Sequence, residues 1–173
     1  MTRQELLGQL AKLITAIQCP HPARVAIDGI DAAGKTTLAD ELAPLLEARD
    51  RLVIRASLDG FHRPRSERYR RGAESPEGYY EDAFNYQLLQ TALLLPLGPG
   101  GNRRYRRAAF DYQQDVPVLA QDEEAPANAV LLLDGVFLLR PELAGLWEYR
   151  IFVKAAFEVA LQRALQLLVY VFE

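Results

Sequence analysis

Eight consecutive residues, Gly29 to Thr36 (GIDAAGKT), satisfy the spacing G-x-x-x-x-G-K-[ST] in full. Glycines in this pattern let backbone N–H groups turn toward phosphate oxygens, and the lysine neutralises charge on them. The hydroxyl that ends the pattern can ligate Mg²⁺, and a helix that begins directly after the loop points its positive end at the phosphates. The spacing therefore predicts a cradle for the phosphates of a nucleotide.

Residue types within this loop indicate separate tasks. Lys35 is expected against the β- and γ-phosphates, Thr36 on Mg²⁺, and Thr37 in a hydrogen bond to the α-phosphate. Asp31 could approach the metal or cap the loop by hydrogen bonding, and both interpretations stay open. The predicted nucleotide-binding residues are Gly29, Ile30, Asp31, Ala32, Ala33, Gly34, Lys35, Thr36 and Thr37.

Two further aspartates are candidates for work on the phosphates. Asp134 closes the apolar run AVLLL, where a carboxylate can hold Mg²⁺ or its water, so Thr36 and Asp134 form the predicted metal pair. Asp59 follows another strand-like run and is a candidate base for the proton of an acceptor hydroxyl. Either aspartate could instead simply begin a turn. His62 follows Asp59 by three positions and is a candidate substrate contact or a packed residue.

The elements that must position these residues alternate between strands and helices. Strands are expected at residues 24–28, 51–57, 129–133 and 148–154, and helices at 4–17, 35–49, 83–95 and 157–168. Residues 103–112 and 116–120 are expected to form two short strands or a hairpin. This order indicates an α/β fold with a mostly parallel sheet, in which ligands gather at the carboxyl ends of strands. Three of the expected strands end at or just before an aspartate followed by glycine, at Asp28, Asp59 and Asp134, which predicts one active site.

Composition limits the classes of protein that fit. The 173 residues are 50% hydrophobic and 25% charged, which is typical of one globular domain. The formal net charge of −3 argues against nucleic acid or an anionic membrane as a partner. The single cysteine, Cys19, permits no internal disulfide, and no run approaches the ~18 apolar residues of a membrane span. A cytoplasmic protein is expected.

Two clusters of arginines stand out against this acidic balance. They are Arg63, Arg65, Arg68, Arg70 and Arg71, and then Arg103, Arg104, Arg106 and Arg107. A solvated surface is the plain interpretation. Single-strand nucleic-acid binding, with the interleaved tyrosines as stacking platforms, is a second interpretation that the net charge disfavours. The third, which we favour over nucleic acid, is contact by one or two of them with a phosphorylated or polyhydroxylated ligand.

Four segments together resemble the uridine kinase and phosphoribulokinase group of P-loop kinases. They are GIDAAGKTT (29–37), SLDGFHRPR (57–65), YYEDAFN (79–85) and LLLDGVFLL (131–139), and the similarity covers residues 25–166. The resemblance implies a single P-loop NTPase domain over residues 1–173, a three-layer α/β/α sandwich with a small substrate-covering hairpin. It also implies ATP as co-substrate, Mg²⁺ as cofactor and a small-molecule hydroxyl as acceptor.

The resemblance also implies roles for individual residues. The aspartate after the second strand acts as the base in this group, which implies Asp59 as a catalytic residue beside Lys35. The group's substrate segment, near His-Pro-Asp-Ala-Phe-Asp, matches residues 80–85 and differs at Tyr80 and Asn85. Its tyrosine- and arginine-bearing hairpin matches residues 103–112. Together with His62, proposed above from its place three residues after Asp59, the predicted substrate-binding residues are Tyr80, Asp82, Phe84, Tyr105 and Arg106.

A nucleoside, uridine-like, or a related metabolite is the expected acceptor, and two alternatives stay open. The loop also suits thymidylate kinase-like proteins, which favours a nucleoside monophosphate kinase, and a non-catalytic nucleotide-binding remnant is the other alternative. The group continues with an arginine-bearing lid and a last strand, whereas here Arg163 is followed by an apolar end at residues 165–173. The lid and last strand are therefore expected to be absent. The apolar end could be buried against a second subunit, which would give a homo-oligomer.

Overall fold

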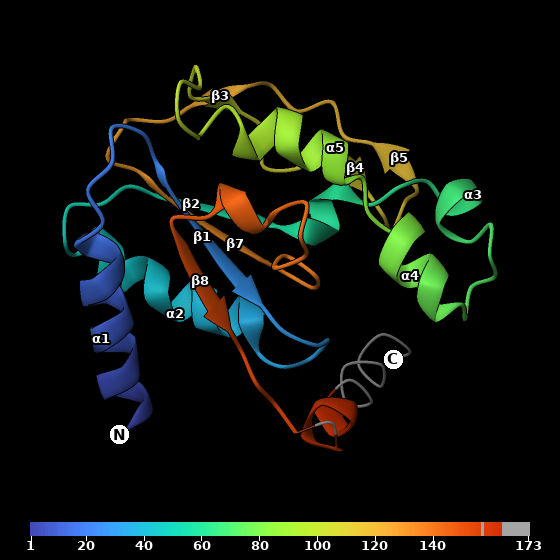
Figure 1. Cartoon of the computed structure of the whole chain (residues 1–173), viewed down its shortest axis with the longest axis horizontal. Helices are drawn as coiled ribbons and strands as arrows, with labels where there is room; N and C mark the ends of the chain where they lie inside the picture. Colours follow the sequence, from blue (N-terminus) through green and yellow to red (C-terminus); the bar gives the residue numbers. More distant parts are fainter. Residues whose placement is uncertain (157, 164–173) are drawn as a thin grey trace.

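Four parallel strands form the centre of the protein in a computed structural model, which describes residues 1–156 and 158–163 (Figure 1). They are β1 (Ala23–Asp28), β2 (Val53–Ser57), β7 (Val130–Gly135) and β8 (Tyr149–Phe152), in the order β2-β7-β1-β8. Asp134 is in register with Ile27 of β1 and with Ser57 of β2. The carboxyl ends of three strands therefore meet at one edge, as the sequence predicts.

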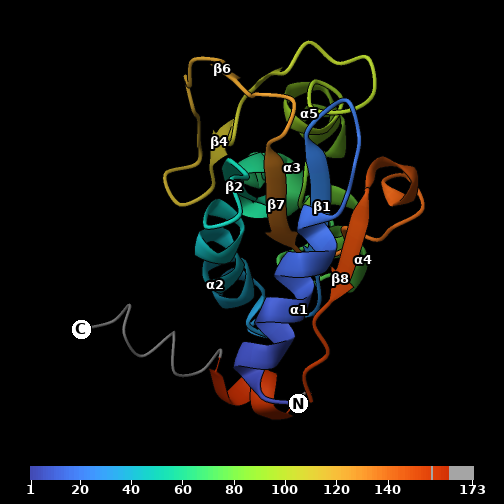
Figure 2. The same ribbon diagram turned by 90° about the vertical axis from the view of Figure 1, so that its left-hand side faces the viewer.

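Two long helices cover one face of this sheet (Figure 2). They are α1 (Arg3–Thr15), whose first turn is closed by a capping box between Thr2 and Glu5, and α2 (Lys35–Glu47), whose N-cap residue is Gly34. Alternate residues of the central strands, such as Val25 and Leu132, point to this side and pack against the helices. The apolar side of α2, the helix that follows the phosphate loop, is thus packed against the sheet.

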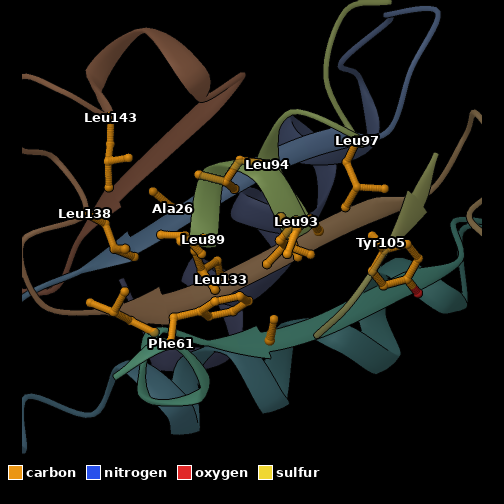
Figure 3. Packing of buried hydrophobic residues seen from close by; sticks show 14 of the residues in the cluster. Ala26, Phe61, Leu89, Leu93, Leu94, Leu97, Tyr105, Leu133, Leu138 and Leu143 are labelled. Atoms are coloured by element: carbon orange, nitrogen blue, oxygen red, sulfur yellow. The ribbon is translucent and has the colours of Figure 1, made fainter. Parts of the chain in front are cut away.

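The opposite face carries the larger hydrophobic cluster, which Figure 3 shows from close by. Leu131 and Leu133 of β7 pack there against α5 (Tyr86–Leu89) and the π-helical turn Gln90–Leu94. Both faces of β7 are therefore buried, which is why its sequence is continuously apolar rather than alternating. The three layers confirm the expected α/β/α sandwich.

A nested β-ribbon lies over the end of β2. β3 (Arg104–Tyr105) pairs with β6 (Glu123–Glu124), and β4 (Phe110–Asp111) pairs with β5 (Val116–Pro117), both antiparallel. The ribbon is hydrogen-bonded to the short helix η1 (Leu58–Phe61): the Ala109 N–H donates to the carbonyl oxygen of Gly60 at 2.8 Å. A Cβ at position 60 would lie 2.7 Å from the Ala108 Cβ, so this close approach requires glycine. The expected pairing of residues 103–112 with 116–120 is confirmed at β4 and β5, whereas β3 pairs with residues 123–124, beyond the predicted strands.

The remaining elements are short. They are α3 (Arg65–Arg68), α4 (Pro76–Asp82) and η3 (Ala144–Leu146), with a further helical stretch at residues 158–163. The helix expected from residue 83 begins instead at Tyr86, because the Asn85 side chain accepts the N–H of Leu88 at 3.0 Å and caps it. Within the described part of the chain, no helix has both the length and the apolar character to cross a membrane. The expectations for the end of the chain, an absent lid and last strand and a buried apolar segment, concern residues 164–173, which lie outside that part.

Candidate active site

The phosphate loop runs from the end of β1 to the start of α2 and depends on its two glycines. Gly29 has φ +154°, and a Cβ there would lie 2.5 Å from the carbonyl oxygen of Val153. Gly34 has φ +94° and forms the N-cap of α2, where no side chain satisfies the first N–H groups of the helix. These N–H groups are left for an anion. The loop thus has the backbone that its sequence predicts.

Lys35 lies inside this loop rather than out in solvent. The residue is buried, and its Nζ donates to the carbonyl oxygen of Ile30 at 2.7 Å. This contact spans the loop and holds the ammonium over the turn that Gly29 and Gly34 shape. The position is the one from which a lysine can neutralise the charge of bound phosphates.

Thr36 and Asp134 meet beside the loop. The Thr36 hydroxyl donates to Asp134 Oδ2 at 2.8 Å, and the Asp134 side chain is only 4% exposed. A hydroxyl and a carboxylate are hard oxygen ligands, and Mg²⁺ is usually held by one or two carboxylates together with phosphates and water. Among the residues that the structure describes, no group of three or more His, Cys, Asp or Glu side chains gathers into a metal cluster. The pair fits Mg²⁺ bound together with a nucleotide, because phosphate oxygens and water would supply the remaining ligands.

A buried aspartate fixes the start of the loop. Asp28 ends β1, where its Oδ1 accepts the N–H of Gly29 at 2.6 Å and its Oδ2 accepts the N–H of Leu139 at 2.9 Å. Both oxygens are thus occupied by the backbone. This carboxylate joins the phosphate loop to the segment after β7 and is a positioning group rather than a reacting one.

Asp59 stands in η1, directly after β2, and its side chain is 60% exposed. Its Oδ1 lies 3.6 Å from His62 Nε2. The other ring nitrogen of His62 is 3.1 Å from the carbonyl oxygen of Ala83, which can only accept, so Nδ1 carries a proton. The imidazole lies between the rings of Phe84 and Tyr112, with centroids 4.4 and 4.9 Å away. His62 is therefore held beside the candidate base.

Tyr79 of α4 connects the acceptor segment to the phosphate loop. Its hydroxyl donates to Asp31 Oδ2 at 2.8 Å. Burial, with the nearby carboxylates of Asp31 and Asp59, raises the pKa of Tyr79 above its ordinary value, so the hydroxyl stays protonated at neutral pH. Among the described residues, the hydrogen bond that the Asp31 carboxylate accepts is this one, which anchors α4 to the loop. This contact brings residues 79–85 to the sheet edge.

The residues of the predicted substrate segment lie in different surroundings. The Asp82 carboxylate is paired with Arg70 and Arg71 at 2.7 Å each, and these hydrogen bonds lower the pKa of Asp82. Phe84 is 1% exposed and belongs to the core. Tyr80 stacks under the guanidinium of Arg140 at 4.5 Å. Acceptor contact by Tyr80, Asp82 and Phe84 stays a prediction.

The two predicted hairpin residues lie within the ribbon itself. Tyr105 is 3% exposed, and its hydroxyl donates to Glu123 at 3.4 Å. Arg106 is 3.5 Å from Asp122. Contact of either residue with an acceptor likewise stays a prediction, and for Tyr105 it requires the ribbon to move.

Several arginines of the two clusters have acidic partners within the fold. Beyond the pairs just described, the ion pairs are Arg63 with Glu67, Arg68 with Asp115, and Arg107 with Glu123. A cavity of about 290 Å³ lies against the first cluster and is lined by Arg63, Glu67, Arg70, Arg71, Glu81 and Asp82. Three positive and three negative side chains line it, so the cavity has no net charge with which to select an anion.

Sequence reasoning missed three residues that the fold brings to the site. Arg55 contacts Asp134, Tyr79 contacts Asp31, and Arg140 joins the segment after β7 to Tyr80. Arg55 carried a usable signal, because a charged side chain inside the apolar strand RLVIRAS must find a partner. Tyr79 bonds to a residue 48 positions away, and Arg140, besides its local pair with Glu142, contacts Tyr80, 60 positions away, so no local pattern predicts these long-range contacts.

Known proteins resemble this chain in sequence over part of its length and in structure over nearly all of it. No protein-family model matches the chain. Over 73 residues it is 37% identical to uridine-cytidine kinase B of Dictyostelium discoideum, a stretch that covers 42% of this chain and 29% of that protein. The solved structure of a possible uridine kinase from Bacillus stearothermophilus gives a TM-score of 0.77 at 22% identity, covering 94% of this chain and 85% of that one. A candidate fructose transport system kinase from Silicibacter sp. TM1040 gives 0.78 at 24% identity, covering 100% and 84%.

The chain has the fold of a P-loop kinase and resembles the uridine kinases. The two solved structures establish the fold over nearly the whole chain, and at these identities they establish the fold alone. The sequence match agrees with the resemblance that the four segments indicate, although it spans less than a third of the curated relative. In open α/β sheets in general, ligands bind at the carboxyl ends of the strands, which is where the loop between β1 and α2 lies.

Proposed function

We propose that this protein is a small-molecule kinase that transfers the γ-phosphoryl group of ATP to a hydroxyl of a nucleoside or a related metabolite. The observation on which this rests most is the 2.8 Å hydrogen bond between Thr36 and Asp134 beside a complete phosphate loop. A loop alone would indicate only that a nucleotide is held. The added carboxylate, buried at the metal side, is what phosphoryl transfer requires.

The proposed reaction is a direct in-line transfer. The amides of the loop and Lys35 hold the β- and γ-phosphates, and Thr36 with Asp134 would hold Mg²⁺, which when bound neutralises charge on the phosphate oxygens. Asp59 accepts the proton of the acceptor hydroxyl as its oxygen bonds to the γ-phosphorus. In the same step the bond from that phosphorus to the β,γ-bridging oxygen breaks, and ADP leaves with the bridging oxygen.

The surroundings of Asp59 support a neutral acceptor that carries a ring. His62 lies beside Asp59, Tyr112 packs on His62, and Tyr79 is near enough for the Asp59 charge to raise its pKa. Arg63, Arg70 and Arg71 of the first cluster have acidic partners. Stacking on such rings suits a base or a sugar face. Nucleosides and sugars are thus favoured over acceptors that already carry a phosphate, which disfavours the nucleoside monophosphate alternative.

An acceptor panel tests this proposal. Purified protein with MgATP is incubated with nucleosides, fructose and other sugars, pantothenate, and nucleoside monophosphates, and ADP release is measured against a no-acceptor control. We expect stimulated ADP release with at least one nucleoside or sugar. Stimulation by a nucleoside monophosphate alone would replace the proposal with the monophosphate kinase alternative. Nucleotide binding without turnover on any acceptor would favour the non-catalytic alternative.

A further inference from the structure

An arginine touches the carboxylate that we assign to Mg²⁺. Arg55 lies on β2, and its Nη2 is 3.2 Å from Asp134 Oδ1. The other oxygen of the same carboxylate, Oδ2, accepts the Thr36 hydroxyl at 2.8 Å. Each oxygen of this nearly buried side chain therefore has its own anchor. With both anchors in place, the carboxylate is held in one orientation.

Arg55 is itself fixed by two neighbouring elements. Its Nη1 donates to the carbonyl oxygen of Leu132 on β7 at 3.0 Å. Its Nε and Nη2 donate to Asp40 Oδ1 on α2 at 3.1 and 2.9 Å. A guanidinium is a rigid planar fork, so these contacts lock its direction as well as its position. The fork joins β2, β7 and α2 around the single carboxylate of Asp134.

The charges of this group leave the metal side attractive to a cation. Arg55 is shared between Asp134 and Asp40, so one positive and two negative charges sum to one negative unit. Asp40 stands one helical turn after Thr36 on α2. Arg55 therefore anchors Asp134 without cancelling the negative charge of this three-residue group.

We propose that Arg55 is a positioning residue for phosphoryl transfer. It fixes the orientation of Asp134 so that Oδ2 and the Thr36 hydroxyl face the metal position together. The proposal rests on the proposed function, because it requires a magnesium–nucleotide complex at the loop. The alternative is that Arg55 only neutralises a buried carboxylate, and the two roles predict opposite responses to loss of the arginine.

Calorimetric titration with ADP, in the presence of Mg²⁺ and in EDTA, separates these roles. The variants are Arg55→Met, which removes the charge and the fork, and Arg55→Lys, which keeps the charge without the fork. We expect the gain in ADP affinity that Mg²⁺ provides to fall about tenfold in both, as is typical when a partner of a metal ligand is lost. Affinity in EDTA should stay at the wild-type value, because the loop is untouched.

Arg51→Met serves as the matched control. Arg51 precedes the same strand, and its guanidinium donates to the carbonyl oxygens of Thr15, Ile17 and Asn128 rather than to a carboxylate. It should behave as wild type in both conditions. The lysine variant alone suffices for the test if the methionine variant does not fold.

Three results would overturn the positioning role. One is a wild-type magnesium effect in both Arg55 variants. Another is a stronger effect in Arg55→Met with wild-type behaviour in Arg55→Lys, which is the signature of charge neutralisation. The third is an equal loss of affinity with and without Mg²⁺, which indicates general damage. A wild-type protein that binds no ADP in either condition would overturn the proposed function and this inference together, whereas the first three results leave the proposed function standing.

Discussion

The two sides of the candidate site are built in different ways. On the phosphate side, Gly29, Lys35, Thr36 and Asp134 are held by backbone geometry and short hydrogen bonds at the ends of paired strands. On the acceptor side, the elements are brief, with four residues in α3 and seven in α4, and side-chain ion pairs such as Arg70–Asp82 hold them together. The phosphate side is thus built on the paired strands of the sheet, and the acceptor side consists of short segments attached to it by side-chain contacts.

This difference indicates where chemistry and selectivity are separated in the molecule. Strand register fixes the phosphate side, so a change there should affect every nucleotide-dependent property. The acceptor side is joined to it by Tyr79 on Asp31 and by the ribbon on Gly60. Changes there should alter acceptor use or stability while nucleotide binding survives. Substitutions on each side therefore test whether nucleotide binding and acceptor use are separable.

Lys35→Met on the phosphate side should have the largest effect. The ammonium inside the loop is lost, so the charge of the β- and γ-phosphates is no longer neutralised in the transition state. Turnover is expected to fall by about 10³- to 10⁵-fold, the range for losing a cation that stabilises the transition-state charge of phosphoryl transfer. ADP release with the best acceptor of the panel measures it, with Lys12→Met on the exposed side of α1 as the control. Turnover within a few fold of wild type would contradict the assigned role of Lys35.

Asp59→Asn, at the boundary between the two sides, should separate binding from transfer. The amide keeps the size of the side chain but cannot accept the acceptor proton, so kcat should fall about 10²- to 10⁴-fold. ADP affinity should be unchanged, because Asp59 lies outside the phosphate loop. Steady-state kinetics and calorimetry measure the two quantities, and Asp50→Asn, at an exposed turn before β2, is the control. Undiminished kcat in the Asp59→Asn protein would refute its role as base.

The sequence predicts the phosphate side far better than the acceptor side, for a physical reason. The loop is contiguous, and strand alternation alone brings Asp134 to it, so local patterns contain most of the information. The acceptor side depends on contacts such as Tyr79 with Asp31, which are 48 residues apart. No periodicity encodes such a contact. Asn85 is intermediate, because its capping tendency is local but was hidden within a run that also fits a helix.

Tyr79→Phe tests the hydrogen bond between Tyr79 and Asp31, which connects the acceptor side to the phosphate side. The ring keeps its packing against Phe137, but the hydrogen bond to Asp31 is lost, and such a bond contributes about 1 kcal/mol. The acceptor KM should therefore rise about fivefold, while ADP affinity changes little. Initial rates over a range of acceptor concentrations measure this, and Tyr69→Phe, on an exposed ring, is the control. A larger change in ADP affinity than in acceptor KM would mean that Tyr79 serves the loop instead.

Asp82→Asn should have the smallest effect, and it should act on stability. The hydrogen bonds from Arg70 and Arg71 hold the pKa of Asp82 below its ordinary value of 3.8, so the folded state favours the charged form. This contribution is fully present above that value and is lost as the pH falls through the lowered pKa. Tm should therefore fall by a few degrees at pH 7, and the difference from wild type should shrink at acidic pH.

The expected loss is modest because the two arginines are 64% and 48% exposed, so water screens the pair. Thermal melts at pH 7 and below pH 4 measure the difference, with Asp122→Asn as the control. Asp122 faces Arg106 at 3.5 Å in an open pair and should leave Tm unchanged at both values. If Asp82→Asn instead preserved Tm at pH 7 and raised only the acceptor KM, Asp82 would be a substrate contact. The boundary between acceptor site and scaffold would then move to include the pair with Arg70 and Arg71.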